Sequence, residues 1–404
     1  MNTFRALFYK QNIQNTNSYL IVLFGFFLPL SVSIADMILG LLLLLWIYEG
    51  NFSQKLRTLH NNPITYAFLA FFIVHVLGLL WTNNLNWGLH IVSKEWKILV
   101  VLILITITQK EHIKYYISSF LLAMSLSEIL SYGIWLEIIA PFKSATIDNP
   151  TPFMSHISYS PFLAFSIYLL GYFLLFDKKK NKTEKILSLI FILTMTINIF
   201  ITGGRAGQVG FFVIISILAL QYFKKNFLQL ALVFFIAIPS IFLIAYNSSK
   251  LFHDRVNLAI KDTQTFKKDP NTSVGLRLTF LFNSLDIIKK NPILGVGTGD
   301  FPEEYAKMSK KNTPKAKLTV NPHNMYSLVT VQTGLLGLLA LLSIFYMQIK
   351  ESFKKREYSQ IQLVLPLLFL TLMFSDSYLL GHYTTMLFIY FSSFLYKDYE
   401  SEHT

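Results

Sequence analysis

The feature that most constrains this fold is a series of apolar segments. Their lengths are close to the roughly 20 residues that a helix needs to cross a bilayer. Only 14% of the residues are charged, whereas about 25% is usual in a soluble domain. Inside a bilayer the backbone must satisfy its own hydrogen bonds, so these segments are expected to be helical. The sequence therefore predicts an all-α polytopic membrane protein with about twelve transmembrane helices, near residues 19–33, 35–48, 64–80, 94–109, 114–140, 159–176, 186–202, 209–222, 227–246, 323–346, 361–374 and 378–396.

Basic residues are unequally divided between the two sets of connections. One set contains Lys55, Lys110 and the lysine-rich run at 178–185, whereas the opposite short connections hold few. Because lysine and arginine are retained on the cytoplasmic side, we expect both termini to be cytoplasmic. Topology then accounts for most of the formal net charge of +13, and no nucleic-acid partner is expected.

One connection differs from the others in length. Residues 247–321 form a segment of mixed charge on the outer side, between the ninth and tenth helices. It divides the chain into 1–246, with helices 1–9, and 322–404, with helices 10–12 and a cytoplasmic tail. A structureless loop of this length is improbable. Residues 276–290 have apolar positions at helical spacing, which predicts a large helical loop containing an amphipathic helix.

The tenth helix is preceded by an unusual polar sequence, "VNPHNMYSLV". We expect Asn321 to be the N-cap and Pro322 the first helical residue, with His323 and Asn324 in the first turn. The positive end of the helix would keep the His323 imidazole neutral, able to accept a proton, and would attract an anion. The alternative is an ordinary capped helix start.

Two arginines are expected on the same outer face. Arg205 lies in the short turn "ITGGRAGQVG", where Gly204 and its neighbouring glycines leave the backbone open to a bulky partner. Arg277 lies on the amphipathic helix. The alternatives are an interfacial arginine that binds lipid headgroups and a solvated helix face. His156 and Asp376 also face outward, and we expect them to bind substrate or support the structure rather than to catalyse.

This residue set indicates chemistry without a metal or other cofactor. The chain has no cysteine, and the outer loops hold no compact Asp-x-Asp motif for a divalent cation. Arginines can neutralise a pyrophosphate through bidentate contacts, and a neutral histidine can take a proton from an attacking hydroxyl. The segment "GVGTGDF" at 295–301 is predicted to be a tight turn rather than a nucleotide loop, since no strand precedes it.

Three blocks carry a resemblance to a known family. "GGRAGQVGFF", "LRLTFLFNSLDIIKKNPILGVGTGDF" and "NPHNMYSLVTVQTGLLGLL" occur in this order and resemble the conserved blocks of the O-antigen ligase family. The superfamily also contains O-antigen polymerases and bacterial O-oligosaccharyltransferases. The blocks cover about the second half of the chain, and the twelve-helix layout with its large outer loop is similar over the whole length.

The resemblance implies a metal-independent, inverting glycosyltransferase of the GT-C type in the bacterial inner membrane, with its active site facing the periplasm. The donor would be a polysaccharide on undecaprenyl diphosphate, and the acceptor a hydroxyl of lipid A–core. Arg205 and Arg277 match arginines that engage the donor diphosphate, and His323 matches the histidine that activates the acceptor. Asn321 and Asn324 would hold this turn and hydrogen-bond substrate.

Alternatives stay open at this point. The nearest is an O-antigen polymerase of the same superfamily, which would extend the lipid-linked glycan. A protein O-oligosaccharyltransferase is expected to be longer. A twelve-helix transporter would have two similar halves and ionisable groups near the middle of the bilayer, which the sequence does not indicate.

Overall fold

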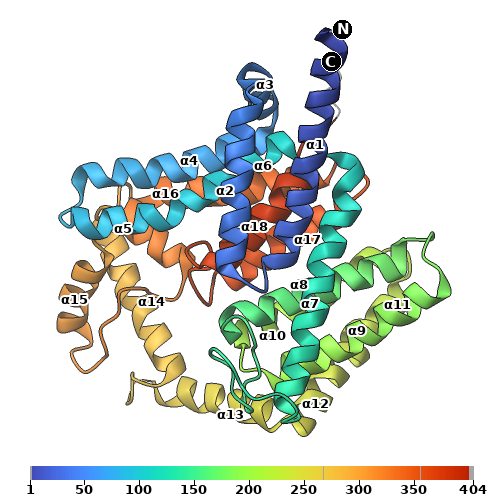
Figure 1. Ribbon diagram of the computed structural model, residues 1–404. Coiled ribbons are helices and arrows are strands. Elements are labelled where there is room, and N and C mark those ends of the chain that lie inside the picture. The colour runs from blue at the N-terminus through green and yellow to red at the C-terminus, as the bar shows by residue number, and fades with distance from the viewer. Residues whose placement is uncertain (1, 267, 355, 400–404) are drawn as a thin grey trace.

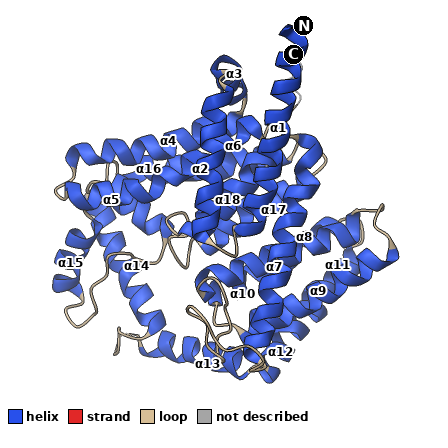
Figure 2. Cartoon of the chain, viewed as in Figure 1, coloured by secondary structure: helices blue, strands red, loops and turns tan. Residues whose placement is uncertain are grey.

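The computed structural model describes residues 2–266, 268–354 and 356–399. In these ranges the chain is helical with connecting loops and has no strand beyond an isolated bridge between Thr146 and Asn149 (Figure 2). The predicted all-α class is confirmed. The helices are α1 (Asn2–Phe27), α2 (Val32–Glu49), α3 (Phe52–Asn61), α4 (Pro63–Leu77), η1 (Gly78–Trp81), α5 (Leu85–Glu95), η2 (Trp96–Leu99), α6 (Val100–Ile107), η3 (Lys110–His112), α7 (Ile113–Trp135), α8 (His156–Phe176), α9 (Lys182–Ile201), α10 (Arg205–Tyr222), α11 (Phe227–Leu232), the π-helix η4 (Val233–Ala237), α12 (Ile238–Ser248), α13 (Lys250–Thr265), α14 (Ser273–Lys290), α15 (Phe301–Asn312), α16 (Met325–Ser352), α17 (Ser359–Leu372) and α18 (His382–Leu395).

Membrane-spanning capacity is confirmed for most of the predicted segments. Eight helical stretches in the described ranges are long and apolar enough to cross a membrane. The other four predicted segments contain α1, the η2–α6 pair, α17 and α18, which do not meet both criteria, so the count of twelve stays a prediction. The eight stretches are Val32–Glu49, Pro63–Trp81, Lys110–Trp135, His156–Phe176, Lys182–Ile201, Arg205–Tyr222, Phe227–Ser248 and Met325–Ser352.

The helices are arranged around α17 and α18, which lie near the centre of the view in Figure 1. Helix α16 packs against α4 and α17, and α8 packs against α9 and α10. Most of α8 is buried, including its Tyr159, Phe162 and Phe165 side chains. These contacts hold the first residues of α8 and α10 next to each other.

The segment between α12 and α16 is helical. Helix α14 spans the amphipathic helix expected at 276–290 and packs against α13, α15 and α16. The sequence analysis did not predict α13 or α15, whose residues are mostly polar. Figure 1 shows α13 and α14 running along one edge of the helical bundle.

The glycine-rich segment before α15 forms the predicted tight turn. Gly295, Gly297 and Gly299 all have positive φ, at 70°, 118° and 100°, which glycine adopts without strain. The turn lies against an interruption in α16 at Gly334, whose φ is 62°. A Cβ on Gly334 would lie 2.1 Å from the Ile293 carbonyl oxygen, so no other residue fits there without movement.

Asp300 lies at the end of this turn and holds the turn against the loop between η1 and α5. Its carboxylate accepts hydrogen bonds from the Thr82 hydroxyl at 2.6 Å, the Asn83 amide at 2.8 Å and the Asn84 amide at 2.9 Å. The Asp300 side chain is buried. This acidic residue therefore has a structural role that the sequence did not reveal.

Candidate active site

A cavity of about 110 Å³ collects polar residues from five parts of the chain. We call it the arginine cavity. It holds Arg205 from the start of α10, Arg255 from α13 and Arg277 from α14. His156, at the start of α8, and Asp376, in the connection between α17 and α18, complete its polar lining. Residues distant in sequence thus meet at one site.

The arginines of this cavity are not held in ion pairs by the residues that the structure describes. None of the three guanidinium groups forms an ion pair in the part of the chain that the structure describes. Arg205 contacts the Ser273 hydroxyl at 3.5 Å, and its buried Nε has no hydrogen-bond partner among the described residues. Arginine binds phosphate oxygens through two parallel N–H donors. The cavity is therefore suited to an anionic group such as a phosphate.

Glycine holds Arg205 close to α8. A Cβ on Gly204 would lie 1.9 Å from the Ser160 hydroxyl oxygen, and one on Gly207 would lie 2.2 Å from the Ser160 Cβ. The bulky partner expected beside these glycines is therefore α8 itself. Gly204 also lines the cavity, but its lack of a side chain serves helix packing.

The predicted start of the tenth helix was wrong by several residues. Helix α16 begins at Met325, and its N-cap is Asn324, whose Oδ1 accepts a hydrogen bond from the Ser327 amide at 2.9 Å. His323 precedes the helix and has a φ of 50°, in the left-handed region that costs a non-glycine residue energy. Asn321 stabilises this backbone by accepting a hydrogen bond from the His323 amide at 2.9 Å. His323 therefore lies just outside the first helical turn, and the predicted effect of the helix end on its imidazole stays a prediction.

The His323 ring faces a carboxylate instead. Its Nδ1 lies 3.2 Å from Asp376 Oδ1. An ionised carboxylate can only accept hydrogen bonds, so Nδ1 carries the proton and Nε2 is left as the acceptor. The opposite side of the ring stacks on Phe280, at 6.2 Å between centroids. Phe280 follows Arg277 by three residues, so α14 contributes to both the cavity and the histidine.

Asn321 and Asn324 hold this arrangement through internal hydrogen bonds. Asn321 Oδ1 also accepts from the Ser377 hydroxyl at 2.9 Å, next to Asp376. The Asn324 Nδ2 donates to the Phe374 carbonyl at 3.2 Å. Both side chains therefore fix His323 relative to the connection between α17 and α18, and a contact with substrate stays a prediction.

His156 belongs to a second short network. Its Nδ1 lies 3.2 Å from Asn149 Nδ2, and Asn149 Oδ1 accepts a hydrogen bond from the Gly203 amide at 2.9 Å. This network fixes the backbone directly before Arg205.

Sequence reasoning missed Arg255 and the partnership of Asp376 with His323. Arg255 lies in α13, where "HDRV" has no distinguishing motif, and Asp376 is 53 residues from His323. Among the described residues, no group of three or more histidine, aspartate or glutamate side chains could hold a metal ion.

The fold and the cavity together define a polytopic helical membrane protein with a site suited to an anionic group. Comparison with known proteins then shows a family similarity. Residues 190–342 match the family model described as O-antigen ligase, so this part of the chain is similar to the O-antigen ligase family. The match includes Arg205, Arg277 and His323, whereas His156 and Asp376 lie outside it.

A sequence relative covers most of the chain. An uncharacterised protein of Haemophilus influenzae is 27% identical over 299 residues, which cover 70% of this chain and 71% of the relative. The similarity to the O-antigen ligase family points to a glycosyltransferase-like enzyme that acts on lipid-linked substrates.

Proposed function

We propose that this protein is an O-antigen ligase, which transfers polysaccharide from undecaprenyl diphosphate to lipid A–core at the periplasmic face of the inner membrane. The observation that carries the proposal is the arginine cavity, in which three arginines, none in an ion pair with a described residue, lie beside the His323–Asp376 pair. The family match supports the reaction class. The position of the arginine cavity next to the His323–Asp376 pair supports the proposed anion site and base.

The proposed reaction is a single displacement at the anomeric carbon. His323 Nε2 accepts the proton of the acceptor hydroxyl while that oxygen forms a bond to the anomeric carbon. The bond from this carbon to the diphosphate oxygen breaks, and the diphosphate leaves with the electron pair. One displacement inverts the anomeric configuration. Asp376 orients the ring and stabilises the imidazolium that forms.

The three arginines have a defined role in this scheme. Negative charge grows on the diphosphate as the bond breaks, and Arg205, Arg255 and Arg277 would stabilise it without a metal ion. Donors that are already positioned require no reorganisation during reaction, and loss of one typically costs about 3–4 kcal/mol of barrier. Arg255 extends the pair that the sequence analysis predicted.

An apolar groove beside the arginine cavity fits the lipid part of the donor. This groove of about 870 Å³ runs along α9, α12 and α13 and is lined mainly by apolar side chains, including Trp135, Phe200 and Ile244. It also reaches Asp254, the neighbour of Arg255 in α13. A polyprenyl chain in the groove would place its diphosphate near the arginines.

The lipopolysaccharide of a deletion strain distinguishes this function from that of a polymerase. The strain is complemented with wild type or His323→Ala, and the lipid-linked glycan pool is measured with the gel profile. Core without polysaccharide, together with long polymer on the lipid carrier, is the result expected of a ligase. Core with a single repeat would instead identify a polymerase. Full restoration of the wild-type ladder by His323→Ala would contradict the proposed base.

A further inference from the structure

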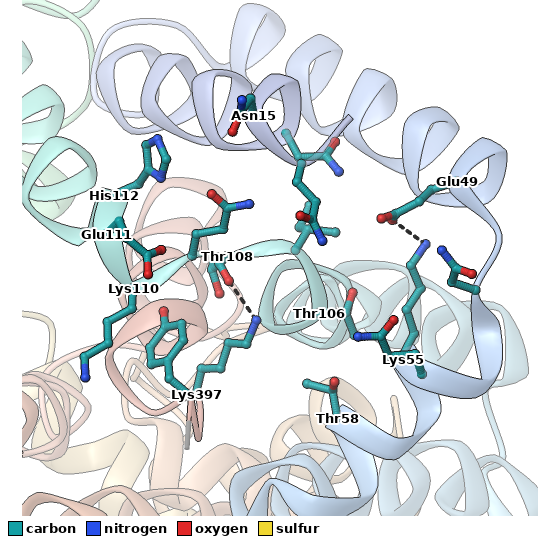
Figure 3. A pocket seen from close by; sticks show the side chains of 17 residues that line it. Asn15, Glu49, Lys55, Thr58, Thr106, Thr108, Lys110, Glu111, His112 and Lys397 are labelled. Carbon is teal, nitrogen blue, oxygen red and sulfur yellow. Dashed lines mark hydrogen bonds and ion pairs between the residues drawn. The ribbon is translucent and has the colours of Figure 1, made fainter. Parts of the chain in front are cut away.

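A second polar site lies at the other end of α7. Helix α7 has 23 residues, or about 34 Å at 1.5 Å per residue, close to the hydrocarbon thickness of a bilayer. Its last residue, Trp135, lines the apolar groove beside the arginine cavity, whereas its N-cap, His112, lines a pocket of about 580 Å³. We call this the polar pocket (Figure 3). It therefore opens at the membrane surface opposite the arginine cavity.

Lysine side chains give the polar pocket a positive lining. Lys55, Lys110 and Lys397 line it, together with Glu49 and Glu111. Figure 3 shows these side chains around one space, with Lys55 paired to Glu49; their Nζ and Oε2 atoms are 2.9 Å apart. Among the described residues that line the pocket, the positive charges exceed the negative ones by one.

Amides and hydroxyls make up much of the remaining lining. Gln14, Asn15, Asn17 and Asn51 contribute amides, and Thr58 and Thr106 are hydroxyl residues on the same wall. Amides present a donor and an acceptor side by side, which suits the hydroxyls of a polyol. A ligand with both a phosphate and free hydroxyls would use both parts of the lining.

Two buried polar groups in this pocket have no hydrogen-bond partner among the residues that the structure describes. The Asn17 side chain is 1% exposed, and neither its Nδ2 nor its Oδ1 has a hydrogen-bond partner; the buried His112 Nδ1 also has none. Leaving a buried polar group unpaired costs about 1–3 kcal/mol. These unpaired groups indicate that the pocket accommodates a polar ligand.

The protein surface around the pocket favours a lipid as the source of that ligand. Tyr19, Ile47 and Phe52 are 64%, 53% and 47% exposed and lie close in sequence to pocket residues of α1 and α2–α3. Acyl chains of a lipid can cover such side chains. We propose that the polar pocket binds the glycerol phosphate headgroup of an anionic phospholipid. Basic pockets between transmembrane helices recognise lipid phosphates in this way.

Thermal unfolding of the purified full-length protein in detergent tests this assignment. The probes are short-chain phosphatidylglycerol, phosphatidylcholine and free glycerol phosphate. Phosphatidylglycerol is expected to raise the unfolding temperature of wild type. The variants Asn17→Asp and Lys110→Glu should each need about tenfold more phosphatidylglycerol for the same rise in unfolding temperature. Lys224→Glu is the matched control, because Lys224 is exposed and lies outside the pocket.

Three results would overturn the proposal. Equal weakening by Lys224→Glu would mean diffuse attraction between charges. Equal stabilisation by phosphatidylcholine would mean that the negative headgroup is not recognised. Equal stabilisation by free glycerol phosphate would assign the pocket to a soluble ligand. If Asn17→Asp does not fold, Lys110→Glu decides alone, since Lys110 is exposed. None of these readouts depends on glycosyl transfer.

Discussion

Replacing Asp376 by asparagine tests whether the His323–Asp376 pair acts as a unit. Asparagine keeps the shape and an acceptor oxygen but removes the charge. At 3.2 Å, two unit charges interact by about 1.3 kcal/mol in water and about 5 kcal/mol at an effective dielectric constant of about 20. His323 is 41% exposed and Asp376 17%, so we expect an intermediate value of about 2–3 kcal/mol. The initial transfer rate should therefore fall about 30- to 150-fold.

The assay measures glycan transfer by purified protein at saturating donor and acceptor. Asp286→Asn is the control, because Asp286 is a half-buried carboxylate on α14 outside the cavity, and its rate should match wild type. The double variant His323→Ala with Asp376→Asn should be no slower than His323→Ala, since Asp376 acts through the histidine. A wild-type rate for Asp376→Asn, or a double variant much slower than His323→Ala, would refute this reasoning.

Three further changes address the cavity and its scaffold. Arg277→Lys should slow transfer nearly as much as Arg277→Ala, because lysine cannot make a bidentate contact. Each change should raise the barrier by about 3–4 kcal/mol. Near-normal ligation by the lysine variant would argue against a bidentate contact. Gly207→Ala should destabilise the fold by about 1–3 kcal/mol through collision with Ser160, while Gly40→Ala, with open space around it, should leave the unfolding temperature unchanged or raised. Asp300→Ala should cost about 2–4 kcal/mol of stability, because it removes buried hydrogen bonds; an unchanged unfolding temperature would disprove its structural role.

Much of the fold could be predicted because bilayer helices leave a local signature. Apolar runs such as 159–176 and 227–246 lie within α8 and within the α11–α12 stretch, since each segment must satisfy its backbone internally. Helix α14 was predicted from the spacing of its apolar residues. The short polar helix α15 was not, because its position depends on Asp300 and on the interrupted α16, which no local pattern encodes.

The site was only partly predictable, for a related reason. Arg205 and Arg277 were found because each belongs to a recognisable block, but Arg255 became a candidate only when α13 placed it beside them. The Asn-Pro pair misled the assignment of the helix start. Asn324 caps α16, and Asn321 instead folds the chain back onto His323 and Ser377. Such a choice between two capping residues is made by tertiary contacts.

The central claim is that His323, beside the arginine cavity, is the base for transfer from a lipid-linked diphosphate. The most direct measurement is the rate at which purified protein moves glycan from such a donor to lipid A–core, with donor binding measured in parallel. We predict that His323→Ala lowers the rate by about 10²-fold or more while donor binding is retained. Wild-type turnover by His323→Ala would contradict the account.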